Sequence, residues 1–309
     1  MNYRDHLPQL DGGLFLTDAG IETYLIFHDG FELPAFAAFP LVDDENGSLA
    51  LRDYYGRYAR LASERGLGLV LEAPTWRASS RWGAELGLSE SELERLNREA
   101  ISMLAELRNR QQGAPVVISG NVGPQDDAYR PDTKLSADAA HDYHRRQLTT
   151  FADTEADMVC ALTLTYAEEA VGIARAAAET GLPAAISFTV ETDGRLPSGQ
   201  PLAEAIAQVE EDSPPAYFML NCAHPTHFEH VLAGGEAWTE RIRGLRANAS
   251  MLSHAELDEA EDLDEGDPDD LAARYVAVRE RLPRLNVLGG CCGTDHRHVQ
   301  AIRDAWLAR

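Results

Sequence analysis

Two adjacent cysteines near the carboxyl end of the chain are the residues best suited to chemistry. Cys291 and Cys292 lie in the segment Leu288–Thr294, which contains three glycines and separates an apolar run from a helical pattern. Neighbouring side chains of a strand point to opposite faces, so the two thiols converge only if the backbone bends, which the glycines permit. Thiolates bind soft metal ions, and Cys222, after another apolar run, could supply a third. Three protein ligands leave one position open, as in a catalytic zinc site, and a substrate thiol is its natural occupant.

Other interpretations of these residues stay open from the sequence. Adjacent thiols also occur as packed core residues or as a vicinal disulfide. The fourth cysteine, Cys160, lies in an apolar stretch and is expected in the core. His224 and His227 follow Cys222 closely and could bind zinc, although loop histidines more often form structural hydrogen bonds. The glycines around Cys291 favour the metal site.

The cysteine pattern resembles the signature of the zinc-dependent homocysteine S-methyltransferase family, which includes S-methylmethionine, betaine and cobalamin-linked members. The specific part is Asn221-Cys222 followed by Gly289–Thr294, and the resemblance extends over nearly the whole chain. Weaker similarities lie in Asp18-Ala19-Gly20, Gly120–Pro124 and Ile186–Thr189. The resemblance implies methyl transfer from a cationic donor, such as S-methylmethionine, to homocysteine, which is a step of methionine biosynthesis. It also implies that the catalytic zinc ligands are Cys222, Cys291 and Cys292.

The resemblance further implies where the amino group of homocysteine binds. Asp18 matches an acidic residue that binds this group in the family. A second family carboxylate, in a Glu-Thr pair after the fourth strand, is replaced here by Leu162-Thr163. Because leucine cannot accept a hydrogen bond, either Glu22 or Glu72 takes over this role or the acceptor thiol lacks an ammonium group. Both glutamates could instead be capping or rim residues.

Aromatic residues near the same strand ends are candidates for binding a methyl-bearing cation, because cations are attracted to ring faces. These candidates are Tyr24, Trp76, Tyr129 and Tyr166, and each could equally be a packing residue. Trp76 lies in Glu72–Leu88, which is expected to be a long binding loop. A cationic donor and an anionic thiolate would lose their charges as the methyl group moves. No general base is needed, because the metal already holds the acceptor as a thiolate.

Short apolar runs alternate with helical patterns along the whole chain. This alternation predicts a single-domain TIM (β/α)8 barrel over residues 1–309, with an open doubly wound sheet as the alternative. The active site of such a barrel lies at the carboxyl ends of its strands, where Asn121, Thr163 and Glu191 join the residues above. The strands are expected at residues 14–17, 68–71, 115–119, 157–162, 184–190, 216–220, 241–247 and 285–288.

Composition limits the possible partners. The net charge is -24, with 51 acidic and 27 basic residues, which argues against binding to nucleic acid or to an anionic membrane. No leader peptide and no membrane-spanning apolar run is recognised, so a cytoplasmic protein is expected. The densest acidic run, Glu256–Asp270, is expected to be a solvated loop. The charge is also compatible with a salt-adapted surface.

Three functions are therefore to be distinguished. The first is a zinc-dependent S-methyltransferase that acts on homocysteine. The second is methylation of a different thiol, which Leu162 suggests. The third is a non-catalytic protein that binds zinc or thiols. A small-molecule thiol and a methyl donor are the expected partners in the first two cases, and the oligomeric state is left open.

Overall fold

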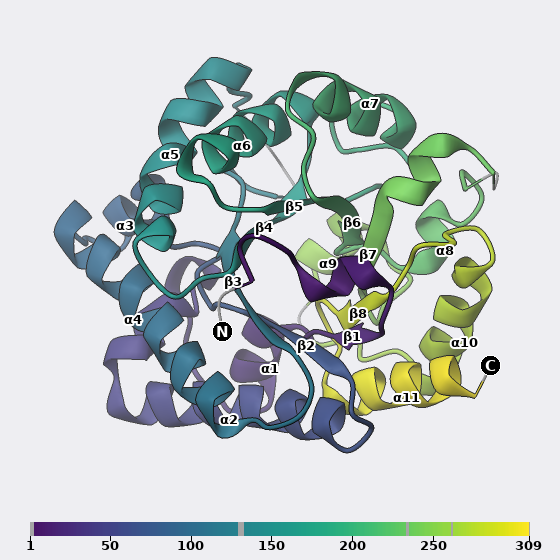
Figure 1. The fold of residues 1–309 in the computed structure, drawn as a ribbon, viewed down its shortest axis with the longest axis horizontal. Helices are drawn as coiled ribbons and strands as arrows, with labels where there is room; N and C mark the ends of the chain where they lie inside the picture. The colour runs from purple at the N-terminus through teal and green to yellow at the C-terminus, as the bar shows by residue number, and fades with distance from the viewer. Residues whose placement is uncertain (1–2, 129–132, 233–234, 261, 309) are drawn as a thin grey trace.

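Eight parallel strands close into a barrel in chain order, and helices surround it (Figure 1). This architecture is seen in a computed structural model that describes residues 3–128, 133–232, 235–260 and 262–308. Strand β1 closes the barrel by pairing with β8, through Phe15 with Val287 and Leu16 with Leu288. The TIM barrel expected from the sequence is therefore confirmed. The open doubly wound sheet is excluded, because the first and last strands pair.

Each expected strand overlaps an observed one. The last lies two residues further along the chain than expected, so Gly289 and Gly290 belong to the strand and not to the turn after it. The strands are β1 (Phe15–Leu16), β2 (Gly68–Glu72), β3 (Val116–Val122), β4 (Met158–Leu164), β5 (Ala184–Phe188), β6 (Tyr217–Asn221), β7 (Ile242–Ala247) and β8 (Val287–Gly290).

Capping residues define several helix ends. Ser89 forms a capping box with Glu92, Ser136 accepts a hydrogen bond from the amide of Ala139, and Gly181 ends a helix with φ 71°. The helices are α1 (Ile21–Phe27), α2 (Glu45–Ser63), α3 (Ser80–Glu85), α4 (Glu90–Arg110), α5 (Ala137–Ala152), α6 (Ala167–Thr180), α7 (Leu202–Asp212), α8 (Pro225–Phe228), α9 (His254–Asp258), α10 (Pro268–Arg279) and α11 (His296–Leu307).

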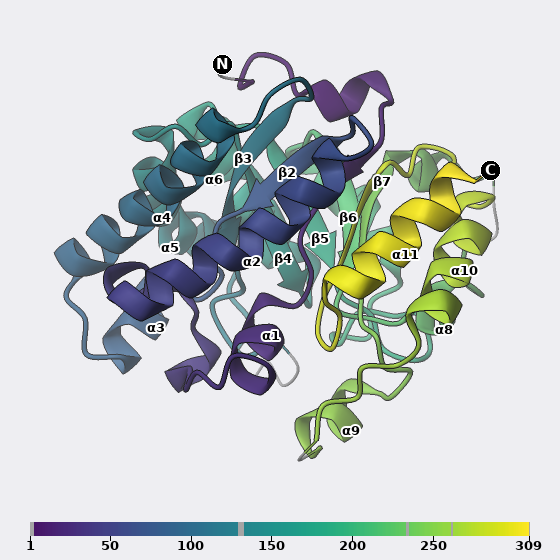
Figure 2. The same ribbon diagram turned by 90° about the horizontal axis from the view of Figure 1, so that it is seen from below.

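Apolar side chains fill both the barrel interior and the layer between strands and helices. Cys160 is completely buried in the interior cluster, which confirms the expectation that it is a core residue. The core leaves the carboxyl ends of the strands free, and α1 and α9 lie beyond that end of the barrel (Figure 2).

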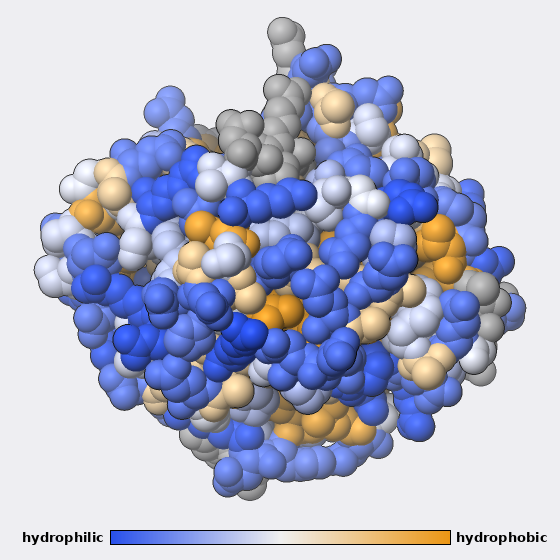
Figure 3. Space-filling view, turned by 90° about the horizontal axis from the view of Figure 1, so that it is seen from above, coloured by the Kyte–Doolittle hydropathy of each residue, from blue (hydrophilic) through white to orange (hydrophobic). Residues whose placement is uncertain are grey.

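One face of the molecule, seen in Figure 3, is predominantly polar. Hydrophilic side chains cover most of the face shown in Figure 3, and apolar groups are scattered among them. Among the residues that the structure describes, no helix combines the length and the apolar character needed to cross a bilayer.

Candidate metal and substrate site

The sulfur atoms of Cys222, Cys291 and Cys292 converge at the carboxyl ends of β6 and β8. All three lie within 4.8 Å of one another, and those of Cys222 and Cys292 are 3.8 Å apart. A tetrahedral zinc ion with Zn–S bonds of about 2.3 Å needs sulfur atoms about 3.8 Å apart. The cysteines are not joined by a disulfide. The donor set and spacing therefore fit a thiolate-bound metal, with room for a further ligand.

The glycines before the cysteine pair serve close packing more than bending. A Cβ atom at Gly289 would overlap Oγ1 of Thr17, and one at Gly290 would overlap Oγ1 of Thr294. Only Gly293, after the pair, has a positive φ of 76°. The expected role of all three glycines in the turn is thus wrong for two of them, because β8 extends to Gly290 and packs against β1.

Cys222 is held in a left-handed backbone conformation, with φ 57°, which is uncommon for a residue with a side chain. Its carbonyl accepts hydrogen bonds from Asn248 Nδ2 at 3.1 Å and from His254 Nε2 at 2.7 Å. The imidazole of His254 is also 3.0 Å from Glu191 through Nδ1. These contacts fix the backbone that carries the first thiol.

Asn221, at the end of β6 and directly before Cys222, connects the ends of β4, β5 and β6. Its Oδ1 accepts hydrogen bonds from Ser187 Oγ at 2.6 Å and from the amide of Thr163 at 2.8 Å, and its Nδ2 donates to Thr163 Oγ1 at 2.7 Å. Thr163 also has a positive φ, 63°, where the register between β4 and β5 shifts. The Asn-Cys pair of the sequence motif therefore supplies one thiol of the cluster and one residue that organises the strand ends.

The pKa values of Cys291 and Cys222 are shifted in opposite directions. The pKa of Cys291 lies well below that of a free thiol, because Cys222 and then Cys292 hydrogen-bond to its sulfur and Arg246 adds positive charge. The pKa of Cys222 is raised, because its hydrogen bonds to Cys291 and Cys292 favour the protonated thiol. The cluster thus already stabilises a thiolate on Cys291.

His224 and His227 do not join the cluster. His224 accepts a hydrogen bond from the amide of Thr226 and caps α8, while Nε2 of His227 lies 2.9 Å from the carbonyl oxygen of Met251. Burial lowers the pKa of His224 to about 4. Both histidines therefore have structural partners, as the alternative interpretation of the sequence expected.

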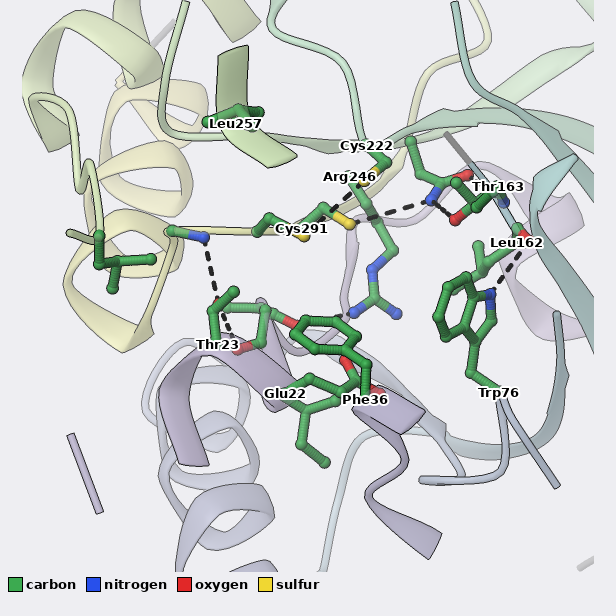
Figure 4. Close-up of a pocket in the computed structure, with 18 of the residues that line it drawn as sticks. Glu22, Thr23, Phe36, Trp76, Leu162, Thr163, Cys222, Arg246, Leu257 and Cys291 are labelled. Atoms are coloured by element: carbon green, nitrogen blue, oxygen red, sulfur yellow. Dashed lines mark hydrogen bonds between the residues drawn. The ribbon is translucent and has the colours of Figure 1, made fainter. Parts of the chain in front are cut away.

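A cavity of about 380 Å³ opens next to the three sulfur atoms. Residues from different strand ends line it, and Figure 4 shows the labelled side chains around it. The sequence-predicted residues that line it are Asp18, Glu22, Glu72, Trp76, Asn121, Thr163, Cys222, Cys291 and Cys292. The structure therefore brings all of these candidates together at the carboxyl-terminal mouth of the barrel, although they are spread over most of the chain.

Asp18 is not a free carboxylate in this cavity. Its Oδ1 lies 3.1 Å from Nη2 of Arg246, and its Oδ2 accepts a hydrogen bond from the Tyr54 hydroxyl at 3.1 Å. Burial raises the pKa of Asp18, and the positive charge of Arg246 opposes this rise. Sequence reasoning missed Arg246, which lies within the strand expected at residues 241–247. The signal was present, since an arginine at the carboxyl end of a barrel strand points to function.

The two glutamates proposed as substitutes for the missing family carboxylate both line the cavity. Glu72 is 2% exposed and Glu22 is partly buried. Burial raises the pKa of each carboxyl group to about 7. Neither Oε2 of Glu72 nor Oδ1 of Asn121 has a hydrogen-bond partner, so both are available as acceptors. Leu162 lines the same cavity with an apolar side chain.

The aromatic candidates divide into two groups. Trp76 lines the cavity, and its indole N–H donates a hydrogen bond to the Leu162 carbonyl at 3.2 Å. The guanidinium of Arg77 lies over its ring. Tyr24 and Tyr166 are instead buried packing residues that do not line the cavity. Tyr129 lies outside the described residues. Phe36, which sequence reasoning missed, also lines the cavity and has an unusual φ of 54°.

Two segments that were expected to be loops contain helices near this mouth. Glu72–Leu88 includes α3, and the acidic run Glu256–Asp270 includes the end of α9 and the start of α10. The acidic run is also more than a solvated loop, because Leu257, Asp258 and Asp264 line the cavity. This part of the cavity lining could not be recognised from the sequence, because acidic residues without aromatic neighbours are typical of solvated loops.

Barrel enzymes carry their active sites at this mouth, so the fold and the convergent thiols define an enzyme with chemistry at sulfur. The chain belongs to the homocysteine S-methyltransferase family, whose model matches residues 16–306. It is therefore a thiol S-methyltransferase.

The chain is similar in sequence to proteins named as homocysteine S-methyltransferases, and similar in fold to a solved structure. The chain is 23% identical to homocysteine S-methyltransferase 2 of Arabidopsis thaliana, with 99% of this chain and 96% of the relative covered. It is 26% identical to homocysteine S-methyltransferase YbgG of Bacillus subtilis, with 72% and 74% covered. The oxidized form of the homocysteine methyltransferase MmuM from Escherichia coli has the same fold, with a TM-score of 0.74, 20% identity and coverage of 96% and 97%.

Proposed function

We propose that this protein transfers a methyl group from a cationic sulfonium, such as S-methylmethionine, to homocysteine and so forms methionine. The observation that carries the proposal is the convergence of Cys222, Cys291 and Cys292 beside a cavity at the barrel mouth. The relatives that are named homocysteine S-methyltransferases support it.

The proposed cofactor is zinc, held by the three cysteines. Bound there, zinc would supply an open coordination position and lower the pKa of a substrate thiol, so that the acceptor is a thiolate at neutral pH. The chain itself contributes the spacing of the sulfur atoms and a neighbouring positive charge at Arg246. Because the site needs reduced cysteines, a reducing compartment such as the cytoplasm suits it.

The walls of the cavity suit a cationic methyl donor. Trp76 and Phe36 offer aromatic surface, and Asp258 and Asp264 bring acidic side chains to the opening. In the reaction the acceptor sulfur attacks the methyl carbon while the bond from that carbon to the donor sulfur breaks. A neutral thioether then leaves, and an apolar site favours this loss of charge.

The acceptor pocket gives homocysteine two kinds of partner. Glu72 and Asn121 present unpaired oxygen atoms, which could accept hydrogen bonds from its ammonium group in place of the family carboxylate at Leu162. A second acceptor class, thiols without an ammonium group, is favoured by Leu162 and by the ion pair that already occupies Asp18.

Mass spectrometry of reaction mixtures tests the proposal. The purified protein is incubated with homocysteine or with another small thiol, and with S-methylmethionine, betaine or a neutral thioether of similar shape as the donor. We expect methionine to form from the sulfonium and not from the thioether, because the thioether would have to expel a thiolate. If no donor in the panel yields methionine while another thiol is methylated, homocysteine is the wrong acceptor.

A further inference from the structure

Arg246 occupies an unusual position for a positive charge. Its side chain is 4% exposed, at the carboxyl end of β7, between the strands that carry the three cysteines. Its backbone carbonyl accepts the amide of Cys222 at 3.1 Å, and its Nε donates to the carbonyl of Gly290 at 3.0 Å, directly before Cys291. Arg246 is therefore held next to Cys222 by its backbone, and its guanidinium is held next to Cys291 by the carbonyl of Gly290.

One edge of this guanidinium has no partner. Nη2 donates to the carbonyl of Ala19 at 2.9 Å and faces Asp18, whereas Nη1 forms no hydrogen bond although it is buried. Buried donors are nearly always satisfied, and a donor on a charged group is costly to leave unpaired. Arg246 lines the cavity, so a bound molecule is the natural source of the missing acceptor.

The position of the guanidinium indicates which of the two substrates, the thiol acceptor or the methyl donor, would contact Nη1. In Figure 4 the guanidinium lies between the sulfur atoms on one side and Phe36 and Trp76 on the other. A thiol bound at the cysteines would extend past Arg246, and the guanidinium would repel the cationic centre of a methyl donor. Planar guanidinium groups bind carboxylates through paired hydrogen bonds.

We propose that Arg246 anchors the carboxylate of the thiol acceptor through Nη1, so that this enzyme selects mercapto acids chiefly by their carboxylate and only secondarily by their ammonium group. This inference rests on the proposed function, because it assigns the acceptor of that reaction. It agrees with Leu162, which offers no hydrogen bond to an ammonium group, and with Asp18, whose charge is already balanced by Arg246.

Calorimetric titration with matched thiols separates this inference from the proposed function, because binding is measured without methyl transfer. The thiols are homocysteine, its analogue without the amino group (mercaptobutanoate) and its analogue without the carboxylate (aminopropanethiol). We expect loss of the carboxylate to weaken binding by roughly 10- to 100-fold, and loss of the amino group to weaken it less. The opposite order would overturn the inference, even if homocysteine is methylated. Failure of every thiol to be methylated while binding follows the expected order would instead count against the proposed function alone.

Substitution of the arginine tests the residue itself. Arg246→Met should weaken the binding of homocysteine and mercaptobutanoate by roughly 10- to 100-fold and leave the affinity for aminopropanethiol nearly unchanged. Arg246→Lys should restore part of the lost affinity. Tyr54→Phe is the matched control, because it removes the hydrogen bonds of the Tyr54 hydroxyl with Asp18 and with the amide of Ala19 while it keeps the guanidinium itself. It should preserve the ratio of the three affinities.

Three results would contradict the assignment. Equal weakening of all three thiols in Arg246→Met would give the arginine a structural role only. The same change of ratio in Tyr54→Phe would show that Arg246 acts through Asp18. A loss confined to the affinity for S-methylmethionine would place the carboxylate of the donor at Nη1. The comparison of thiols on the unsubstituted protein remains decisive if Arg246→Met does not fold.

Discussion

The surrounding protein determines the protonation and the ion pairing of individual side chains at the barrel mouth. The pKa of Glu72 rises from its ordinary value of 4.5 to about 7, because the carboxyl group is almost completely removed from water, and the charge of Arg246 offsets only part of this effect. The ion pair of Asp18 with Arg246 is likewise buried. Such groups are expensive to bury without a function, which is why they mark the site.

Glu72 should make folding stability depend on pH. Between pH 4.5 and about 7 the folded protein binds a proton at Glu72 that the unfolded chain has lost, so stability should fall as the pH rises through this window. This change in the free energy of unfolding should amount to at most about 3 kcal/mol across the window, and Glu72→Gln should remove it. Urea unfolding across the window measures it, with exposed Glu85→Gln as the control. An unchanged pH dependence in Glu72→Gln would show that the carboxyl group has an ordinary pKa.

Elements of secondary structure position these side chains through close backbone contacts. Strand β8 packs against β1 so tightly that a Cβ atom at Gly289 would overlap Thr17 and the carbonyl of Asp18. The same contact brings Asp18 beside the cysteine pair, because the amide of Gly290 donates to the Asp18 carbonyl at 2.9 Å.

Gly289→Ala should therefore destabilise the protein by about 1 to 3 kcal/mol, the usual cost of overpacking, and should weaken metal binding by displacing Cys291. Gly56→Ala is the control, since a Cβ atom at this position in α2 meets nothing within 4 Å. That change should stabilise the helix by about 0.5 to 1 kcal/mol. Thermal unfolding and metal titration measure both effects, and a neutral Gly289→Ala would mean that β1 and β8 can separate without cost.

The strands could be predicted from sequence because each is an apolar run bounded by breaks, and their order follows from the alternation with helices. The three cysteines could be predicted because they follow strand ends. The position of Arg246 at a strand end was visible in the sequence, but its ion pair with Asp18 was not, because Asp18 is distant in the chain and barrel closure brings the two residues together. Phe36 and the cavity wall at Leu257 depend on irregular backbone, which has no periodic signal.

The whole molecule carries a net charge of -24, which acts on stability through repulsion spread over its surface. Salt screens this repulsion over about 10 Å at 0.1 M ionic strength. The protein should therefore become more stable when sodium chloride is raised from low to high concentration, and the unfolding temperature measures this. A fall in unfolding temperature would mean that the surface ion pairs outweigh the general repulsion. Potassium chloride is the control for effects specific to one cation.

Zinc bound by three cysteines is the proposed requirement for thiol methylation. The most direct measurement determines zinc content and homocysteine methylation in Cys222→Ala, Cys291→Ala and Cys292→Ala, with Cys160→Ala as the buried control. We expect about one zinc per chain in the unsubstituted protein and in Cys160→Ala, and loss of both zinc and activity in the other three. Full activity in Cys291→Ala would contradict it.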